Sequence, residues 1–325
     1  MYSICYGEPA SLYDWQCYMK DIVFKRSTDR GQTFGSVMTL AHANDSFFYT
    51  NPLAVSDNLT TSLWLAYVRC TIPSVIVPGT SAFRNCTQLL RHSNDDGITW
   101  DEVTLLNPAL MHDGGVGSGI QLSSRWGGRL LFPRNGFGPL LGDLQANGTR
   151  TWRFGSKLGH IGESQAVELL NGTIIMQMRN HGKYDYIWIR SDDGGETFFK
   201  DDSVHSAPFV PDCPTSIILD RTGSRLLMSH PNPSDRHLPR PLGRKNLTIS
   251  VSIVKPPSSP GPWSDELIIF NGPSGYSSLA KILLEYEHAS LDAMAATSFG
   301  VLYEKSADGV EPLDFQGIEL ALFSI

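Results

Sequence analysis

An eight-residue pattern occurs three times in this chain and constrains its fold more than any other feature. It reads Ser-x-Asp-x-Gly-x-Thr followed by Phe or Trp, at residues 27–34, 93–100 and 191–198. In each copy we expect Ser and Asp to hydrogen-bond the backbone of a turn, Gly to adopt a positive φ, and the aromatic ring to pack under the turn. We call this pattern the clasp. Three clasps indicate a repeat architecture in which each unit ends in the same hairpin.

Short strands with turn signals recur between the clasps. Residues 63–68 read as one strand, and residues 166–170 and 174–178 flank Asn171-Gly172, a strong hairpin signal. Residues 216–220 and 226–229 do the same around Thr222-Gly223. The chain is therefore expected to be all-β.

The spacing of the clasps predicts how many units there are. The wide gap between the second and third clasps leaves room for another unit, whose decayed clasp is the run 148–152. A further eroded copy ends at Pro262-Trp263. Five units, plus one shared between the termini, predict a six-bladed β-propeller that occupies residues 1–325 as a single domain.

Three segments fit this pattern less well. Residues 235–244 and 256–262 are rich in proline and are predicted to be loops. Residues 279–296 have a locally helical pattern, which we interpret as a strand followed by an inserted loop.

Composition narrows the class of function. The net charge of −7 argues against nucleic acid as a partner, because phosphate binding needs a basic face. No apolar run approaches the ~18 residues of a membrane span. Of five cysteines, Cys70 and Cys86 flank a loop between two predicted strands, an arrangement suited to a hairpin disulfide. No cysteine has the spacing of a zinc site, so we predict neither metal nor cofactor.

The chain also contains N-glycosylation sequons, which favour a lumenal or secreted origin. Some of them, such as Asn171-Gly172-Thr173, can equally be read as hairpin turns. The first residues lack the basic and apolar regions of a signal peptide, so we expect the given chain to begin downstream of the native start. The sequons lie at Asn44, Asn58, Asn85, Asn147, Asn171 and Asn246.

The second half of the chain resembles the sialidase (neuraminidase) family, which carries the same clasps. Gly162-Glu163-Ser164-Gln165-Ala166-Val167-Glu168-Leu169, followed by Met178-Arg179-Asn180, is similar to the family's Glu-x-x-x-Val-Glu-Leu…Arg segment. Arg244-x-Asn246-Leu247-Thr248 resembles the stretch that holds a later Arg of the site. Gly272-Pro273-Ser274-Gly275-Tyr276-Ser277-Ser278-Leu279, with Leu302-Tyr303-Glu304-Lys305 downstream, resembles the segment of the catalytic Tyr. The last two segments are closest to the lysosomal type of animal sialidase.

The resemblance implies a site for sialic acid, a sugar whose anomeric carbon carries a carboxylate. A carboxylate nucleophile would be repelled there, whereas a phenol is not, and sialidases use a Tyr nucleophile. Tyr276 is thereby implied as nucleophile and Glu163 as its base. Arg179 and Arg244 are implied to bind the substrate carboxylate through charge-assisted hydrogen bonds.

Each of these positions has an alternative in the sequence. Glu168 competes with Glu163, although it falls within a predicted strand. Arg179 also reads as a strand-end charge and Tyr276 as an ordinary loop aromatic. Positions near Arg244 offer further candidates, namely Arg236, Arg240 and Lys245.

The N-terminal part departs from the family pattern. The family begins with an Arg-Ile-Pro segment that supplies the first of three arginines, and this chain has none. The stretch that matches the family's second Arg region reads Gly7-Glu8-Pro9-Ala10, without an Arg. Asp14 is the candidate acid/base carboxylate and Asp21 the alternative. The first blade is therefore expected to be incomplete, through truncation of an active enzyme or in a relative that has lost catalysis.

As implied by the resemblance, the function is that of an exo-α-sialidase, a retaining glycosidase acting on sialylated glycoproteins, oligosaccharides and gangliosides or other glycolipids. The expected location is the lysosomal lumen or the secretory pathway. The chain is compatible with association with a membrane and with a protein partner there. The alternatives are a sialoglycan-binding propeller without hydrolysis and, third, a propeller used for protein contacts alone.

Overall fold

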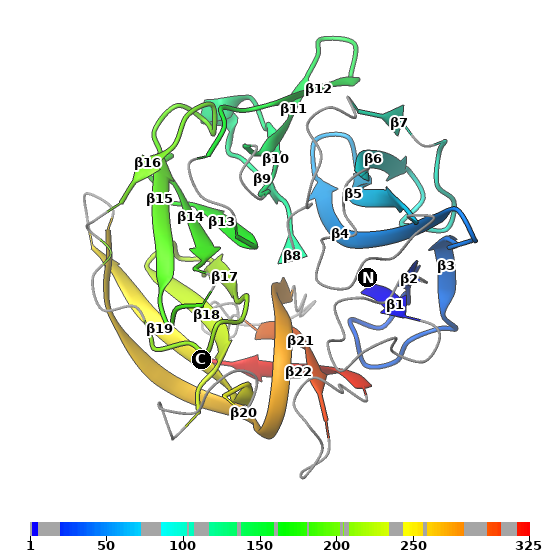
Figure 1. The fold of residues 1–325 in the computed structure, drawn as a ribbon. Helices are drawn as coiled ribbons and strands as arrows, with labels where there is room; N and C mark the ends of the chain where they lie inside the picture. The colour runs from blue at the N-terminus through cyan, green and yellow to red at the C-terminus, as the bar shows by residue number, and fades with distance from the viewer. Residues whose placement is uncertain are drawn as a thin grey trace, which may run out of the picture. The chain divides into compact units, whose positions relative to one another are not determined.

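The computed structural model divides into two compact units, Met1–Glu163 and Ser164–Ile325, each built from β-strands (Figure 1). No helix among the described residues is long and apolar enough to cross a membrane. The prediction that residues 1–325 form one domain stays a prediction. The structure describes residues 2–5, 20–72, 86–102, 104–106, 117–134, 138–158, 162–180, 182–201, 204, 208–233, 243–255, 259–282, 298–306 and 317–325.

The first unit contains three sheets whose strands mostly follow one another as antiparallel hairpins. Their orders are β1-β2-β3, β7-β6-β5-β4-β8 and β12-β11-β10-β9, with β8 parallel to β4. A turn of 3-10 helix, η3 (Ser124–Trp126), follows β9. The strands are β1 (Tyr2–Cys5), β2 (Lys20–Phe24), β3 (Met38–Ala41), β4 (Phe47–Asp57), β5 (Ser62–Thr71), β6 (Cys86–Ser93), β7 (Thr104–Leu105), β8 (Gly117–Ser118), β9 (Ile120–Gln121), β10 (Leu130–Phe132), β11 (Leu140–Leu144) and β12 (Arg150–Phe154).

The core of this unit lies between successive sheets. Ile22 and Ala41 of the first sheet pack against Leu65 and Leu89 of the second. On the other side, Leu53, Val55, Ala66 and Leu90 pack against Leu130, Phe132 and Leu140 of the third. The sheet β9–β12 occupies the chain between the second and third clasps, which confirms the additional unit predicted there.

The three clasps form the hydrogen bonds expected of them. In the second clasp, Ser93 Oγ donates to Asp95 Oδ1 at 2.8 Å, Gly97 N donates to Ser93 Oγ at 2.9 Å, and Thr99 N donates to Asp95 Oδ1 at 2.8 Å. The other two clasps repeat this network. The glycine φ angle is positive in all three, as in Gly97 at 79°.

The aromatic position of the clasp varies. Trp100 packs edge-on against Phe24 with ring centroids 6.0 Å apart. Phe34 of the first clasp is 43% exposed, so the expectation that every ring packs under its turn is wrong for this copy. The turn is therefore held by its hydrogen bonds, since they persist where the aromatic ring is exposed.

We expect the clasps to make stability depend on pH in the acid range. Hydrogen bonds from the Thr99 side chain and backbone lower the pKa of Asp95 from 3.8 to about 2, and Thr33 does the same for Asp29. Because the folded pKa is depressed, the stabilisation is present above pH 3.8 and is lost as the pH falls towards about 2. The free energy of unfolding of Asp95→Asn, measured with urea at several pH values, should fall less between pH 3.8 and about 2 than that of the unchanged chain. The exposed neighbour Asp96→Asn is the control, and identical profiles for Asp95→Asn and the unchanged chain would contradict the assignment.

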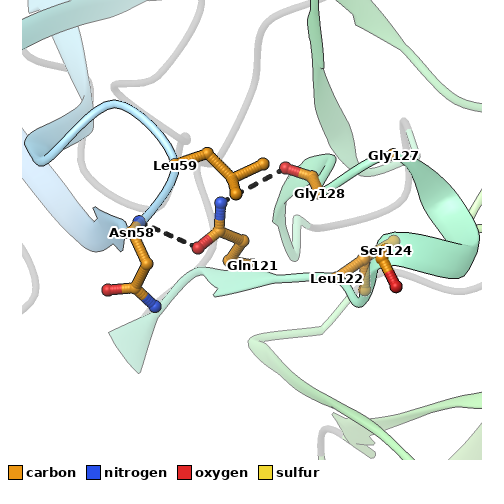
Figure 2. Close-up of a pocket in the computed structure, with 7 residues that line it drawn as sticks. All are labelled: Asn58, Leu59, Gln121, Leu122, Ser124, Gly127 and Gly128. Carbon is orange, nitrogen blue, oxygen red and sulfur yellow. Dashed lines mark hydrogen bonds between the residues drawn. The ribbon is translucent and has the colours of Figure 1, made fainter.

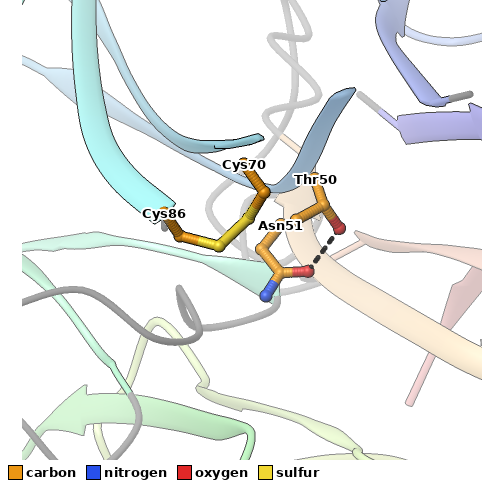
Figure 3. The surroundings of a disulfide bond; sticks show 4 residues. All are labelled: Thr50, Asn51, Cys70 and Cys86. Carbon is orange, nitrogen blue, oxygen red and sulfur yellow. Dashed lines mark hydrogen bonds between the residues drawn. A yellow bond between two sulfur atoms is a disulfide. The ribbon is translucent and has the colours of Figure 1, made fainter. Parts of the chain in front are cut away.

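A disulfide joins Cys70 and Cys86, as the sequence predicted (Figure 3). The two residues lie opposite each other on β5 and β6, and both are buried. Asn51, shown beside the disulfide, has a φ of 53° at a register shift of β4, and its Oδ1 accepts a hydrogen bond from Thr50 Oγ1 at 2.8 Å. The disulfide cross-links β5 and β6, two neighbouring strands of the second sheet of this unit.

Removal of this disulfide is expected to lower the free energy of unfolding by about 3 kcal/mol, because the cross-link restricts the unfolded chain over a sequence separation of 16 residues. Urea unfolding of the variant Cys70→Ala/Cys86→Ala measures the effect. A reductant should shift the midpoint of the unchanged chain towards that of the variant and leave the variant unaffected. An unchanged midpoint after complete reduction would show that the bond does not stabilise the fold.

The second unit contains a four-stranded sheet, β13-β14-β15-β16, and a six-stranded sheet that runs from β17 to β22 in chain order. The hairpins predicted around Asn171-Gly172 and Thr222-Gly223 are confirmed as β13–β14 and β17–β18. The strands are β13 (Ser164–Glu168), β14 (Ile174–Arg179), β15 (Tyr186–Ser191), β16 (Phe199–Lys200), β17 (Ser216–Leu219), β18 (Arg225–Pro231), β19 (Lys245–Lys255), β20 (Ser259–Ile282), β21 (Ser298–Lys305) and β22 (Gly317–Ser324).

The core of this unit also joins neighbouring sheets. Val167, Ile175 and Trp188 of the four-stranded sheet pack against Ile217 and Met228 of the six-stranded one. Farther along, buried residues of β18 and β19 pack with Leu279, Phe299 and Val301 of the last strands.

The long strand β20 changes partners along its length. It pairs with β19 up to Pro273 and with β21 from Ser274 onward. Its beginning corrects the sequence interpretation, because Pro260 and Pro262 lie in the strand where a loop was expected. Prolines are tolerated beside register irregularities, and one such shift occurs where Val254 pairs with Pro260. Of the segment 279–296, which was interpreted as a strand followed by a loop, residues 279–282 form the end of β20, and the rest lies outside the described residues. Residues 235–242 of the predicted loop 235–244 also lie outside them.

Candidate active site

Arg179 ends strand β14, whose other residues are buried apolar or amide side chains. The guanidinium is also buried, with 7% of the side chain exposed, and its Nε donates to Asp212 Oδ1 at 2.6 Å. A buried charge is costly unless it is paired and hydrogen-bonded. Strand β14 therefore places the positively charged side chain of Arg179 in the interior of the second unit, where Asp212 stabilises it.

Asp212 lies in a loop that is buried from residue 210 to residue 215. Its Oδ2 accepts from Gly182 N at 2.6 Å, and its backbone oxygen accepts from Arg244 Nη2 at 3.0 Å. Arg244 immediately precedes β19 and is itself buried. The loop thus contacts two arginines that are 65 positions apart in the chain, one through a side chain and one through the backbone.

Tyr276 lies where β20 has just changed partner. Ser274 pairs with Lys305 and Ser277 with Tyr303, so β20 has one extra residue between them, which is a β-bulge. Arg179 Nη1 donates to Tyr276 Oη at 3.3 Å, and Arg244 Cζ lies 5.6 Å from the centroid of the Tyr276 ring. The Tyr276 amide donates to Glu304 Oε2 at 2.9 Å. A bulge that redirects one side chain thereby places a phenol against two guanidinium groups.

The structure brings together three of the five site residues predicted from the sequence, Arg179, Arg244 and Tyr276, all within the second unit. Of the alternatives to Arg244, Lys245 begins β19, and Arg236 and Arg240 lie outside the described residues.

Glu163 is partly buried and directly precedes β13 as the last residue of the first unit. Glu168, its alternative, is partly buried at the end of β13 and lies opposite Ile174. The prediction of Glu163 as base stays a prediction.

The predicted acid/base residue Asp14 lies outside the described residues. Its alternative, Asp21, is buried on β2, where Oδ1 accepts from Ala43 N and Oδ2 bonds His42 Nδ1, both at 2.7 Å. These bonds give Asp21 a structural role in joining β2 to the segment after β3.

Asp212 and Tyr186, which lie around this cluster, were not predicted from the sequence as site residues, and Glu304 was named only as part of a segment, without a role. Asp212 and Glu304 bond Arg179 and the Tyr276 amide, and Tyr186 Oη donates to Cys213 O at 3.1 Å. Burial raises the pKa of Tyr186 well above 10, so the hydroxyl stays neutral and remains a donor. The prolines on either side of Asp212-Cys213 were the signal in the sequence, because they mark a rigid loop.

A separate pocket of about 350 Å³ lies in the first unit (Figure 2). The Gln121 amide spans it, accepting from Asn58 N at 2.9 Å and donating to Gly128 O at 3.4 Å. None of the four predicted site residues that the structure describes, Glu163, Arg179, Arg244 and Tyr276, lines it. Its lining consists of Asn58, Leu59, Gln121, Leu122, Ser124, Gly127 and Gly128. Among the residues that the structure describes, no three His, Cys, Asp or Glu side chains are grouped closely enough to hold a metal ion.

The clasps and sheets define a class of repeat protein, and the chain belongs to the family of BNR repeat-like domains, whose model matches residues 19–282. No curated protein matches its sequence. Membership of this family therefore rests on the family model, and similar solved structures give the fold.

Several solved sialidases share this architecture. The structure is similar to the Hadza microbial sialidase Hz136, with a TM-score of 0.65, 22% identity and coverage of 89% of this chain and 57% of that one. It is similar to the intramolecular trans-sialidase of Ruminococcus gnavus, with a TM-score of 0.70, 16% identity and coverage of 95% and 88%. The leech intramolecular trans-sialidase gives a TM-score of 0.71, 17% identity and coverage of 94% and 64%. The chain spans less than two thirds of the Hadza and leech proteins, and the likeness establishes a sialidase-type β-propeller fold.

Proposed function

We propose that the protein is an exo-α-sialidase that removes terminal sialic acid with retention of configuration. The observation that carries this proposal is the convergence of Arg179 and Arg244 on the Tyr276 phenol inside the second unit. Two buried guanidinium groups beside one phenol suit a ligand with a carboxylate next to an electrophilic carbon. The sialidase fold of the chain supports the same reading.

In this mechanism, the two arginines bind the substrate carboxylate and Tyr276 Oη attacks the anomeric carbon. Glu163 takes the phenol proton, so that the nucleophile carries charge only as the bond forms. Asp14 protonates the leaving glycosidic oxygen and later removes a proton from the water that hydrolyses the sialyl-enzyme. The two displacements together retain the anomeric configuration.

The proposal extends to the finer features that the sequence resemblance implied. The substrates would be sialylated glycoproteins, oligosaccharides or gangliosides, and the nearest type would be the lysosomal sialidase of animals. Six blades follow if the six-stranded sheet acts as two blades divided at Pro273–Ser274, where β20 exchanges β19 for β21.

The test is turnover of a fluorogenic sialoside between pH 4 and 7, with the released sugar identified by NMR. Free sialic acid in the α-anomer as first product supports the proposal. A 2,7-anhydro product, like the 2,7-anhydro-Neu5Ac bound to the leech trans-sialidase, would assign an intramolecular transfer instead. No turnover by a folded chain would contradict hydrolysis, and binding of sialic acid under the same conditions would then identify a sialoglycan-binding propeller.

A further inference from the structure

Within the proposed function, we propose that Asp212 is the positioning residue that holds both arginines in the geometry that binds the substrate. The proposal rests on the proposed function for its substrate and on the second unit alone for its geometry. Asp212 bonds Arg179 through its carboxylate and Arg244 through its backbone carbonyl, so its effect on the substrate passes through these two arginines.

The contact with Arg179 fixes the direction of the guanidinium. Asp212 Oδ1 accepts from Nε at 2.6 Å, while Nη1 on the other side of the group reaches Tyr276 Oη at 3.3 Å. A guanidinium is planar and its donors are set in a rigid fork. Holding Nε therefore determines where the remaining donors of Arg179 point.

The second contact uses the backbone of the same residue. The Asp212 carbonyl accepts from Arg244 Nη2 at 3.0 Å, and the face of the Tyr276 ring lies near the same guanidinium, 5.6 Å from ring centroid to Cζ. One loop residue thus sets the separation between two cations that would otherwise repel each other. Its carboxylate also offsets part of their combined charge in a buried site.

Hydrogen bonds to neighbouring residues hold the loop at 210–215 in place. Tyr186 Oη donates to Cys213 O at 3.1 Å, and Thr215 Oγ1 donates to Gln177 Oε1 at 2.7 Å, on the strand that ends in Arg179. Gly182 N donates to Asp212 Oδ2 at 2.6 Å. The carboxylate is therefore held on both oxygens, which is the behaviour of an orienting group and not of a proton donor to substrate.

The main variant is Asp212→Asn, which keeps the size of the side chain. The Asn amide has one oxygen for two donors, so its NH2 group faces either Arg179 Nε–H or Gly182 N–H, donor against donor. In both orientations the contact with Arg179 loses the negative charge of the carboxylate and is weakened. The matched control is Asp57→Asn, because Asp57 Oδ2 pairs with Arg150 Nε at the same 2.6 Å in a buried ion pair of the first unit. Both variants are expected to lower the unfolding midpoint. Only Asp212→Asn should raise KM for the sialoside, by about ten-fold or more, with a smaller change in kcat.

A direct readout of the positioning contact does not require turnover. In ¹⁵N NMR of the arginine side chains, the Arg179 Nε–H signal, assigned with Arg179→Lys, should exchange slowly in the unchanged chain and rapidly in Asp212→Asn. Binding of N-acetylneuraminic acid, measured by calorimetry, should weaken by about ten-fold in Asp212→Asn and stay within about two-fold in Asp57→Asn.

The outcomes separate this inference from the proposed function. Unchanged KM, ligand binding and Nε–H exchange in folded Asp212→Asn would overturn the positioning role while the enzyme stands. If the unchanged chain neither cleaves the sialoside nor binds sialic acid, the proposed function fails, and the exchange rate of Arg179 Nε–H alone decides the role of Asp212. Equal KM changes in Asp212→Asn and Asp57→Asn would also overturn it, because a general loss of stability would then explain both.

Discussion

Replacing Tyr276 with Phe is expected to reduce kcat for sialoside hydrolysis by about a thousand-fold or more, because the change removes the nucleophilic oxygen. The ring remains beside Arg244, and both arginines remain in place, so the affinity for free sialic acid should change by no more than about three-fold. Steady-state kinetics with a fluorogenic sialoside and calorimetry with N-acetylneuraminic acid measure the two effects.

The control for this variant is Tyr303→Phe. Tyr303 is a buried tyrosine on β21, the strand that pairs with the same stretch of β20. Its substitution tests whether loss of any hydroxyl in this sheet slows the reaction, and kcat should remain within about three-fold. Turnover by Tyr276→Phe close to that of the unchanged chain would contradict the role of Tyr276.

Replacing Arg179 with Ala is expected to have two large effects. The affinity for sialic acid should fall by about a hundred-fold, because a charge-assisted, doubly hydrogen-bonded contact is lost. The free energy of unfolding should fall by about 3–5 kcal/mol, because Asp212, with 2% of its side chain exposed, keeps a buried charge without its Arg179 partner. Urea unfolding and calorimetry separate the two.

The double variant Arg179→Ala/Asp212→Ala distinguishes these causes. Removing both charges should restore part of the lost stability, since no uncompensated ion remains, whereas binding of sialic acid should stay weak. An Arg179→Ala chain that binds sialic acid as tightly as the unchanged chain would rule out Arg179 as a ligand of the carboxylate. A double variant as unstable as the single one would show that the ion pair is not the source of the loss.

The sequence predicted the local parts of this fold well. Clasps and hairpins depend on residues a few positions apart, so Asp95 with Thr99, or Asn171-Gly172, can be read directly from the chain. The exposure of Phe34 and the strand conformation of Pro260 could not be read in this way. Both depend on what packs or pairs from elsewhere in the chain.

The same distinction applies to the candidate site. Arg179, Arg244 and Tyr276 were predicted because short segments around them resemble a known family. Asp212 lies 33 positions after Arg179, and Glu304 lies 28 positions after Tyr276. No local pattern links Asp212 to Arg179, and Glu304 was recognised only as part of a downstream segment of the resemblance, without a role. The buried loop at 210–215 and the pairing of β20 with β21 bring these residues to their partners.

The central claim, that Tyr276 is the nucleophile of a retaining sialidase, is tested most directly by trapping the covalent intermediate. A 3-fluorinated sialosyl fluoride suits this test, because its ring fluorine withdraws electrons and slows hydrolysis of the sialyl-enzyme. Mass spectrometry of the digested chain should then find one added sialyl group on the peptide that contains Tyr276, and none in Tyr276→Phe. A chain that turns over the sialoside but carries the added group on another residue, or carries none, would contradict the account.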